Sequence, residues 1–271
     1  MSQYKLGFIG TGAMAEAIMY GVIKSELYAP QEIITSDVNE QRLVQVASEL
    51  DVYTTMDNNQ VIEKAQIIVL SIKPQHFKPV LNSLKVLPDK SKLIISIAAG
   101  ISTSYLEKKL GEVPIVRVMP NTPALVGAGM TALSVGTYSG EEHLNLAEQI
   151  FKSVGKTVVI AENLIDAVTG LSGSGPAYVY QFIEALADGG VQIGLPRKTS
   201  YILAAQTVIG AGLMVLKTGL HPGELKDMVT SPGGAAIRAV NILEKAGFRA
   251  TVMDAVEASY LKSRQLGSTE E

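Results

Sequence analysis

The chain has 271 residues, enough for two ordinary domains with a sizeable buried core. Hydrophobic residues make up 47% and charged residues 18%, and the net charge of -3 gives no electrostatic reason to expect nucleic acid or an anionic membrane as partner. The sequence contains no cysteine, which excludes disulfides and thiolate chemistry, and its N-terminus lacks a signal-peptide layout, so we expect a soluble, cytoplasmic protein.

Short apolar runs alternate with helical patterns over the first 160 or so residues. Strands are expected at residues 6–9, 33–35, 67–71, 93–97, 115–118, 130–135 and 157–160. Helices are expected at residues 13–24, 40–50, 103–110 and 141–153. Alternation of this kind predicts an α/β fold with a mostly parallel, doubly wound sheet, a Rossmann domain, over residues 1–163.

The pattern changes after Glu162, where no further strand is expected. Helical stretches are expected at residues 165–187, 198–217, 225–229, 236–246 and 250–266. These predict an all-helical second domain over residues 164–271. Residues 202–216 are apolar all round and must be buried. We expect burial against a second copy, with Gly210 and Gly212 allowing close backbone approach; the alternative is packing within one chain. Gln206 and Thr207 interrupt this run, so no membrane span is expected.

A glycine-rich turn directly follows the first expected strand. Gly10, Gly12 and Ala15 form the G-x-G-x-x-A variant of the dinucleotide fingerprint. Gly10 permits a tight turn, Gly12 lets the backbone approach a pyrophosphate, and Ala15 lets the helix pack on the sheet. The alternative is an ordinary strand-to-helix turn that binds no dinucleotide. The strand–turn–helix context favours dinucleotide binding at a helix N-terminus.

An acid, Asp37, stands at the end of the second expected strand. An acid at this place binds the adenosine ribose and favours NADH over NADPH. It could instead cap the helix that begins near Glu40. Ser36 beside it could donate a hydrogen bond to a phosphate, so the choice between NADH and NADPH stays open.

Candidate chemistry is sparse elsewhere. His76 and His143 are expected to face solvent, His221 is expected to be structural, and no spacing suggests a metal site. Asn121 follows a strand, at the place where a nicotinamide is expected, and Arg117 before it could form a structural ion pair.

Residues 231–236 (SPGGAA) open a helix, with Ser231 expected as its N-cap and Pro232 as its first residue. The backbone N–H groups at this helix start lack partners and would hold a carboxylate. The alternative is a capped helix without a ligand.

Across nearly the whole chain these segments resemble pyrroline-5-carboxylate reductases, the last enzymes of proline biosynthesis. The matching stretches are residues 8–12 (FIGTG), 72–74 (IKP), 98–100 (AAG), 117–123 (RVMPNTP), 169–178 (TGLSGSGPAY), 188–196 (DGGVQIGLP), 221–227 (HPGELKD) and 231–234 (SPGG). The resemblance implies hydride transfer from NADPH or NADH to the C=N bond of 1-pyrroline-5-carboxylate, giving L-proline. It also implies a homodimer through the C-terminal helices, and possible assembly of dimers into a larger ring.

The resemblance further implies which residues form the site, with no residue marked as certainly catalytic and no metal. Cofactor contacts are expected, together with Asp37, from Ile9, Gly10, Thr11, Gly12, Ala13, Met14, Ser36, Asn58, Ser71, Ile72, Lys73, Pro74, Ile97, Ala98 and Ala99. Substrate contacts are expected, together with Asn121, from Glu162, Ser231, Gly234, Ala235 and Ala236. The sequence offers no histidine that is placed to relay a proton. This fits the chemistry, because a protonated iminium is already electrophilic and needs no strong acid from the protein.

One departure from the family pattern bears on activity. Threonine is usual where this chain has Ala236, and its hydroxyl is expected to hydrogen-bond the ring nitrogen; Gln66 replaces a usual aspartate with less consequence. A related cyclic imine as substrate, or a low-activity or non-catalytic dinucleotide-binding paralogue, are therefore alternatives. Hydroxyacid dehydrogenases are a weaker rival, because their lysine and asparagine positions are Val179 and Ile183 here.

Overall fold

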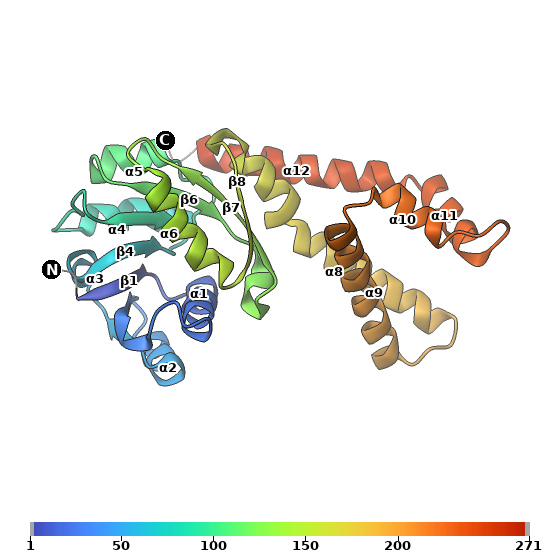
Figure 1. The fold of residues 1–271 in the computed structure, drawn as a ribbon, viewed down its shortest axis with the longest axis horizontal. Coiled ribbons are helices and arrows are strands. Elements are labelled where there is room, and N and C mark those ends of the chain that lie inside the picture. Colours follow the sequence, from blue (N-terminus) through green and yellow to red (C-terminus); the bar gives the residue numbers. More distant parts are fainter. Residues whose placement is uncertain (1–2, 269–271) are drawn as a thin grey trace. The chain divides into compact units, whose positions relative to one another are not determined.

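The computed structural model of the protein describes residues 3–268. The chain divides into two compact units (Figure 1). The first runs to Ser174 and includes the segment from Ser259 on, and the second spans Gly175–Ala258. The expected domain boundary near residue 163 stays a prediction.

The first unit contains an eight-stranded sheet with the order β3-β2-β1-β4-β5-β6-β7-β8. The pairing is parallel except between β6 and β7, which confirms the mostly parallel Rossmann sheet. The strands are β1 (Tyr4–Ile9), β2 (Ile33–Ser36), β3 (Tyr53–Thr55), β4 (Ala65–Leu70), β5 (Leu93–Ser96), β6 (Ile115–Met119), β7 (Gly129–Val135) and β8 (Gly155–Val159).

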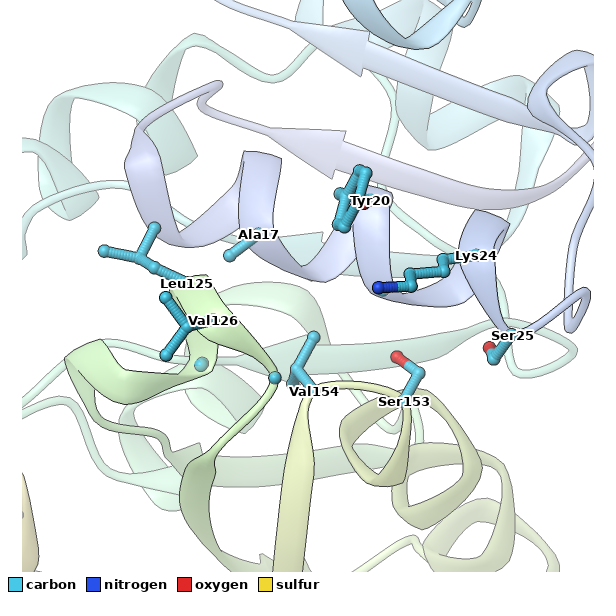
Figure 2. Close-up of a pocket in the computed structure, with 11 residues that line it drawn as sticks. Ala17, Tyr20, Lys24, Ser25, Leu125, Val126, Ser153 and Val154 are labelled. Atoms are coloured by element: carbon cyan, nitrogen blue, oxygen red, sulfur yellow. The ribbon is translucent and has the colours of Figure 1, made fainter. Parts of the chain in front are cut away.

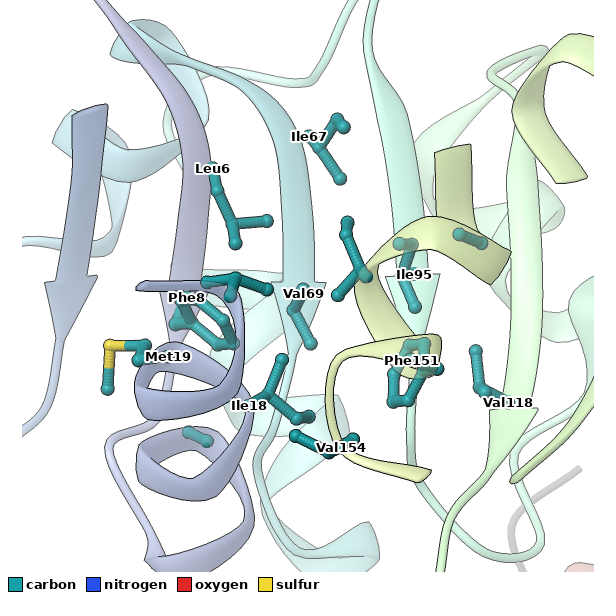
Figure 3. Packing of buried hydrophobic residues seen from close by; sticks show 14 of the residues in the cluster. Leu6, Phe8, Ile18, Met19, Ile67, Val69, Ile95, Val118, Phe151 and Val154 are labelled. Atoms are coloured by element: carbon teal, nitrogen blue, oxygen red, sulfur yellow. The ribbon is translucent and has the colours of Figure 1, made fainter. Parts of the chain in front are cut away.

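Helices cover both faces of this sheet: α1 (Ala13–Lys24), α2 (Glu40–Leu50), α3 (Asn58–Lys64), α4 (Phe77–Ser83), α5 (Thr103–Leu110) and α6 (Glu141–Lys152). One face packs against α1 and α6, the other against α3, α4 and α5. Figure 3 shows the first of these cores, where strand residues meet helix residues: Phe8, Val69, Ile95, Ile18, Met19 and Phe151. Each such side chain contributes about 1.5–3 kcal/mol on burial, which fixes the strand ends that carry the site.

The helix α2 shows how local signals set an element's start. Asn39 is its N-cap, and the Asn39 side chain accepts a 3.2 Å hydrogen bond from the backbone N–H of Arg42. The interpretation of Asp37 as the cap of this helix is therefore wrong. The Asp37 carboxylate instead accepts a hydrogen bond from the glycine-rich turn, at the backbone N–H of Thr11.

Helices follow β8 for the rest of the described chain, up to residue 268, which confirms the all-helical C-terminal region. They are α7 (Ile165–Val168), α8 (Gly175–Gln192), α9 (Arg197–Thr218), α10 (Pro222–Met228), α11 (Ala235–Lys245) and α12 (Phe248–Ser268). The single helix expected over residues 165–187 is interrupted. A π-helical turn at Thr169–Gly173 and a bend at Ser174 separate α7 from α8.

The helix α9 carries large apolar side chains that its own chain leaves uncovered. Ile202, Ile209 and Leu216 are 62%, 55% and 67% exposed and recur every seven residues, so they lie on one face. By length and composition α9 is the one helix among the described residues that could cross a membrane. An exposed apolar stripe of this kind marks an interaction surface.

Candidate active site

The glycine-rich turn between β1 and α1 has the geometry that its sequence predicts. Gly10 has φ +94°, and a Cβ at this position would lie 2.7 Å from the backbone oxygen of Ser71. Only glycine fits there without strain. Gly12 is extended and is the N-cap of α1, and a Cβ built on it meets no atom within 4 Å. Gly10 therefore shapes the turn, while Gly12 keeps a space open beside the helix start.

Thr11, between these glycines, is fully buried and held on three sides. Its hydroxyl lies 2.8 Å from the Thr35 hydroxyl, and its backbone N–H donates to Asp37 Oδ2 at 2.8 Å. Its carbonyl accepts from Arg42 Nε at 2.8 Å. The N–H and the carbonyl of Thr11 are thus both held by side chains, one just after β2 and one in α2, which rigidifies the turn.

Acidic and basic side chains alternate around the glycine-rich turn: Asp37, Arg42 and Glu16. The second Asp37 oxygen accepts from the backbone N–H of Asn39 at 2.9 Å, and the Arg42 guanidinium pairs with Glu16 of α1. Arg42 was not among the residues predicted from the sequence. A basic residue in the first turn of the helix that follows Asp37 is the signal that could have indicated it.

The remaining predicted cofactor residues lie where neighbouring parallel strands end. Ser36, the last residue of β2, donates to Asn58 Oδ1 at 2.7 Å. Ser71, just past β4, donates to the carbonyl of Gly10 at 2.5 Å. Residues 72–74 follow Ser71, and residues 97–99 follow β5. In open α/β sheets, ligands bind at this carboxyl edge.

This edge fits a dinucleotide. The first amides of α1 lack partners within the helix, and its dipole favours a pyrophosphate there. The space beside Gly12 is the place where a Cβ would otherwise stand. Ile9, Thr11, Ala13 and Met14 surround the turn, so the predicted cofactor residues of β1 and α1 share one location.

The two substrate residues predicted in the first unit are both engaged by the protein itself. Asn121 Nδ2 donates to the carbonyl of Ser172 at 3.0 Å, and its Oδ1 accepts from the backbone N–H of Met130 at 2.8 Å. Glu162 pairs with the buried Arg117 at 3.2 Å, so of the roles open to that arginine it has the structural ion pair.

The other predicted substrate residues belong to the second unit, at the start of α11. The helix begins at Ala235, with Gly234 as its N-cap, so the prediction that Ser231 caps it and Pro232 opens it is wrong. Residues 231–234 instead form a turn in which Gly234 N donates to the Ser231 carbonyl at 3.0 Å. A Cβ on Gly234 would lie 2.4 Å from Ser231 Oγ. The serine hydroxyl therefore packs against the helix start.

Two of the three histidines cap helices, and the third, His76, is exposed and makes no side-chain cap hydrogen bond. His221 Nδ1 accepts from the backbone N–H of Gly223 at 3.0 Å, at the start of α10. His143 Nδ1 accepts from the backbone N–H of Gly140 at 3.0 Å, at the start of α6. Residues 3–268 contain no group of three or more histidine, cysteine, aspartate or glutamate side chains that could hold a metal.

A hollow of about 560 Å³ lies along α1, away from the glycine-rich turn (Figure 2). Its walls are Tyr20 and Lys24 of α1 on one side and Leu125 and Val126 on the other. Two serine hydroxyls line it, those of Ser25 and Ser153. Each donates to a carbonyl of its own helix, of Val22 and of Ile150 respectively. The two serine hydroxyls are thus used within their own helices, and the hollow lies apart from the glycine-rich turn. We place the reaction at the carboxyl edge of the sheet.

Comparison with known proteins decides the family. Residues 162–266 match the sequence model described as "Pyrroline-5-carboxylate reductase dimerisation", and residues 5–100 match that described as "NADP oxidoreductase coenzyme F420-dependent". The pyrroline-5-carboxylate reductase of Pisum sativum is 47% identical, over 97% of this chain and 96% of its own. The chain belongs to the pyrroline-5-carboxylate reductase family.

Other members of this family give the same match at full length. The Escherichia coli pyrroline-5-carboxylate reductase is 42% identical, over 98% of this chain and 99% of its own. A solved pyrroline-5-carboxylate reductase from Coxiella burnetii is 37% identical with a TM-score of 0.90, covering 98% of this chain and 99% of its own. The reductase from Plasmodium falciparum, solved with NADP bound, is 36% identical with a TM-score of 0.86 over 98% and 99% of the two chains.

Proposed function

We propose that this protein is an imine reductase that converts 1-pyrroline-5-carboxylate to L-proline. Bound NADPH or NADH supplies a hydride to the imine carbon and is oxidised, while the ring nitrogen takes up one proton. The full-length similarity to reductases of this name, at 42–47% identity, is the observation that carries the proposal. It agrees with the dinucleotide-type turn at Gly10 and Gly12.

The residues at the carboxyl edge are proposed to bind the cofactor. The first amides of α1, at Ala13 and Met14, would donate to the pyrophosphate, and the space beside Gly12 would admit it. Ser36 and Asn58 would contact the adenosine end, and residues 71–74 and 97–99 would contact the remainder. The negative charge of Asp37 disfavours a 2′-phosphate, whereas the positive charge of the nearby Arg42 favours it. The proposal therefore includes both NADPH and NADH as cofactors.

The start of α11 is proposed to hold the substrate carboxylate. The first amides of a helix have no partner within it, and Ala235 and Ala236 occupy its first two positions. The Ser231 hydroxyl, close to Gly234, would add a donor. An anion is favoured at this positive end of the helix dipole, which orients the ring for hydride attack.

Ala236 keeps two alternatives open: a related cyclic imine as the substrate, or a paralogue of low or no activity. Alanine offers no hydroxyl to the ring nitrogen. A protonated iminium needs no strong acid from the protein, so the reaction remains chemically accessible without one. The proposal of activity therefore holds despite the substitution.

The protein is proposed to act as a cytoplasmic homodimer. The match to a dimerisation sequence model supports homo-oligomerisation. We propose that the exposed stripe of Ile202, Ile209 and Leu216 on α9 is covered by a second copy rather than by lipid. Further assembly of dimers into a ring is part of the same proposal.

Turnover of purified protein tests the function. Oxidation of NADPH and of NADH is measured side by side, with 1-pyrroline-5-carboxylate and with its six-membered analogue. We expect turnover with the five-membered ring, and its mass-identified product should be proline. No turnover with either imine, in protein shown by titration to bind cofactor, would refute the reductase proposal.

A further inference from the structure

The Glu162 carboxylate accepts three hydrogen bonds from two elements of the first unit. Oε1 accepts from the backbone N–H of Thr103 at 2.7 Å and from Arg117 Nη1 at 3.2 Å. Oε2 accepts from the Thr103 hydroxyl at 2.5 Å. Glu162 is the first residue after β8 and its short connection, and Thr103 is the first residue of α5. One carboxylate therefore joins the exit of the sheet to the start of a helix.

Burial makes this arrangement specific. The Arg117 side chain is 7% exposed and that of Glu162 is 27% exposed. Within residues 3–268, Arg117 Nε is buried without a hydrogen-bond partner. The guanidinium thus depends on Glu162 for its compensating charge. Strand register places Arg117 beside Ser96, the last residue of β5, so the pair lies level with the end of that strand.

Thr103 is also the far end of a short segment that begins where β5 ends. Ile97 N donates to the carbonyl of Leu70 at 3.3 Å, which anchors the near end of the segment. Ala98 and Ile101 are buried, and Gly100 turns the chain with φ +77°. The segment of residues 97–102 is thus tied at one end to β4 and at the other to Glu162 through Thr103.

We propose that Glu162 is a positioning residue for hydride transfer: its carboxylate, with Arg117 and Thr103, fixes residues 97–100 in the place where the nicotinamide would lie. This rests on the proposed function, in which that segment contacts the cofactor. Three hydrogen bonds from the protein hold the Glu162 carboxylate, and in this proposal it acts through Thr103. A displacement of about 1 Å at a reacting centre lowers turnover by about 100-fold.

The wild-type protein is assayed first, because its failure to turn over 1-pyrroline-5-carboxylate would refute the proposed function and not this inference. Glu162→Gln is then compared with Glu112→Gln, which removes an exposed carboxylate paired with Lys90 on the surface. We expect kcat of Glu162→Gln to fall by about 10- to 100-fold with a change of less than about threefold in cofactor affinity. The control should match the wild type.

The kinetic isotope effect separates positioning from loss of folded protein. With cofactor deuterated at the transferred position, the isotope effect on kcat should rise in Glu162→Gln, because hydride transfer becomes the slower step. A fall in activity that matches the folded fraction, with an unchanged isotope effect, would overturn the proposal. So would a large rise in KM for the imine with unchanged kcat, since that indicates direct substrate contact.

A milder pair of variants keeps the test available if Glu162→Gln does not fold. Thr103→Val removes only the hydroxyl that donates to Glu162 Oε2, and Thr103→Ser keeps it. We expect kcat to fall by about 3- to 10-fold in the first variant, with the same rise in isotope effect, and to be restored in the second. Equal behaviour of the two variants would contradict the positioning role.

Discussion

The backbone N–H of Thr11 donates a 2.8 Å hydrogen bond to the carboxylate of Asp37. The acid that in this fold family binds a cofactor ribose therefore also holds the glycine-rich turn in place. The carboxylate charge therefore has two effects: it holds the turn through Thr11, and it acts on the ribose or the 2′-phosphate of a bound cofactor. The two effects can be separated by comparing the two nicotinamide cofactors.

Asp37→Ser should change cofactor preference. Removing the carboxylate relieves repulsion of a 2′-phosphate and removes an acceptor for the ribose. We expect kcat/KM with NADH to fall by about tenfold and the ratio of NADPH to NADH efficiency to rise. Steady-state kinetics with both cofactors measures this ratio. An equal loss with both would mean that Asp37 acts only through Thr11.

Gly12→Val should abolish cofactor binding and leave the fold intact. A Cβ at Gly12 meets no protein atom within 4 Å, so the new side chain would fill the space intended for the pyrophosphate. Cofactor titration should show no binding, with Tm unchanged. Normal affinity would show that the turn is merely structural.

Gly10→Ala is the informative contrast to that variant. Its Cβ would approach the Ser71 carbonyl to 2.7 Å at a φ of +94°. We expect the free energy of unfolding to fall by about 1–3 kcal/mol, measured by urea denaturation. A stability equal to that of the wild type would contradict the turn geometry.

Ala236→Thr should raise kcat/KM for 1-pyrroline-5-carboxylate by about 10- to 100-fold, because a hydrogen bond to a charged group is worth about 1.5–3 kcal/mol. Cofactor affinity should not change. Ala236→Val is the matched control, since it adds similar bulk without a hydroxyl. If threonine lowers activity, alanine is an adaptation to another imine or to a bound water.

Ile209→Asp should dissociate the proposed dimer. Ile209 is 55% exposed at the centre of the stripe on α9, and a charge there could not be buried against a second copy without a large penalty. Light scattering after gel filtration measures the mass. Val44→Asp, which places the same charge at a 65% exposed valine of the first unit, should keep the wild-type mass. A dimeric Ile209→Asp would contradict this interface.

Elements with strong periodicity and clear end signals could be predicted from the sequence. The helices over residues 13–24, 40–50 and 103–110 begin and end as expected. The strand β3 and the helices α3 and α4 were not predicted, because segments of three to seven residues show too little periodicity. β3 forms by pairing with β2, and Tyr53 stacks on Tyr4. That is a tertiary contact which local sequence does not encode.

The site was predictable as a set of residues but not as a set of contacts. The strand ends and the glycine-rich turn follow from the fingerprint. The hydrogen bond from Asn121 to the Ser172 carbonyl joins chain segments that are far apart in the sequence. The start of α11 was misplaced because Ser231 and Gly234 are both acceptable N-caps, and the chain forms a turn over residues 231–234 before the helix begins.

The last helix also determines how the chain can be divided. Ser259 Oγ donates to Ser174 Oγ at 2.8 Å, and Ser263 Oγ donates to Asp166 Oδ1 at 2.7 Å. The helical unit of residues 175–258 therefore leaves the first unit and re-enters it at adjacent points, in the manner of an inserted domain. Truncation after residue 174 would strip the first unit of its closing segment. Excision with a short linker from 174 to 259 would keep that segment, so the dinucleotide-binding unit could be transplanted whole.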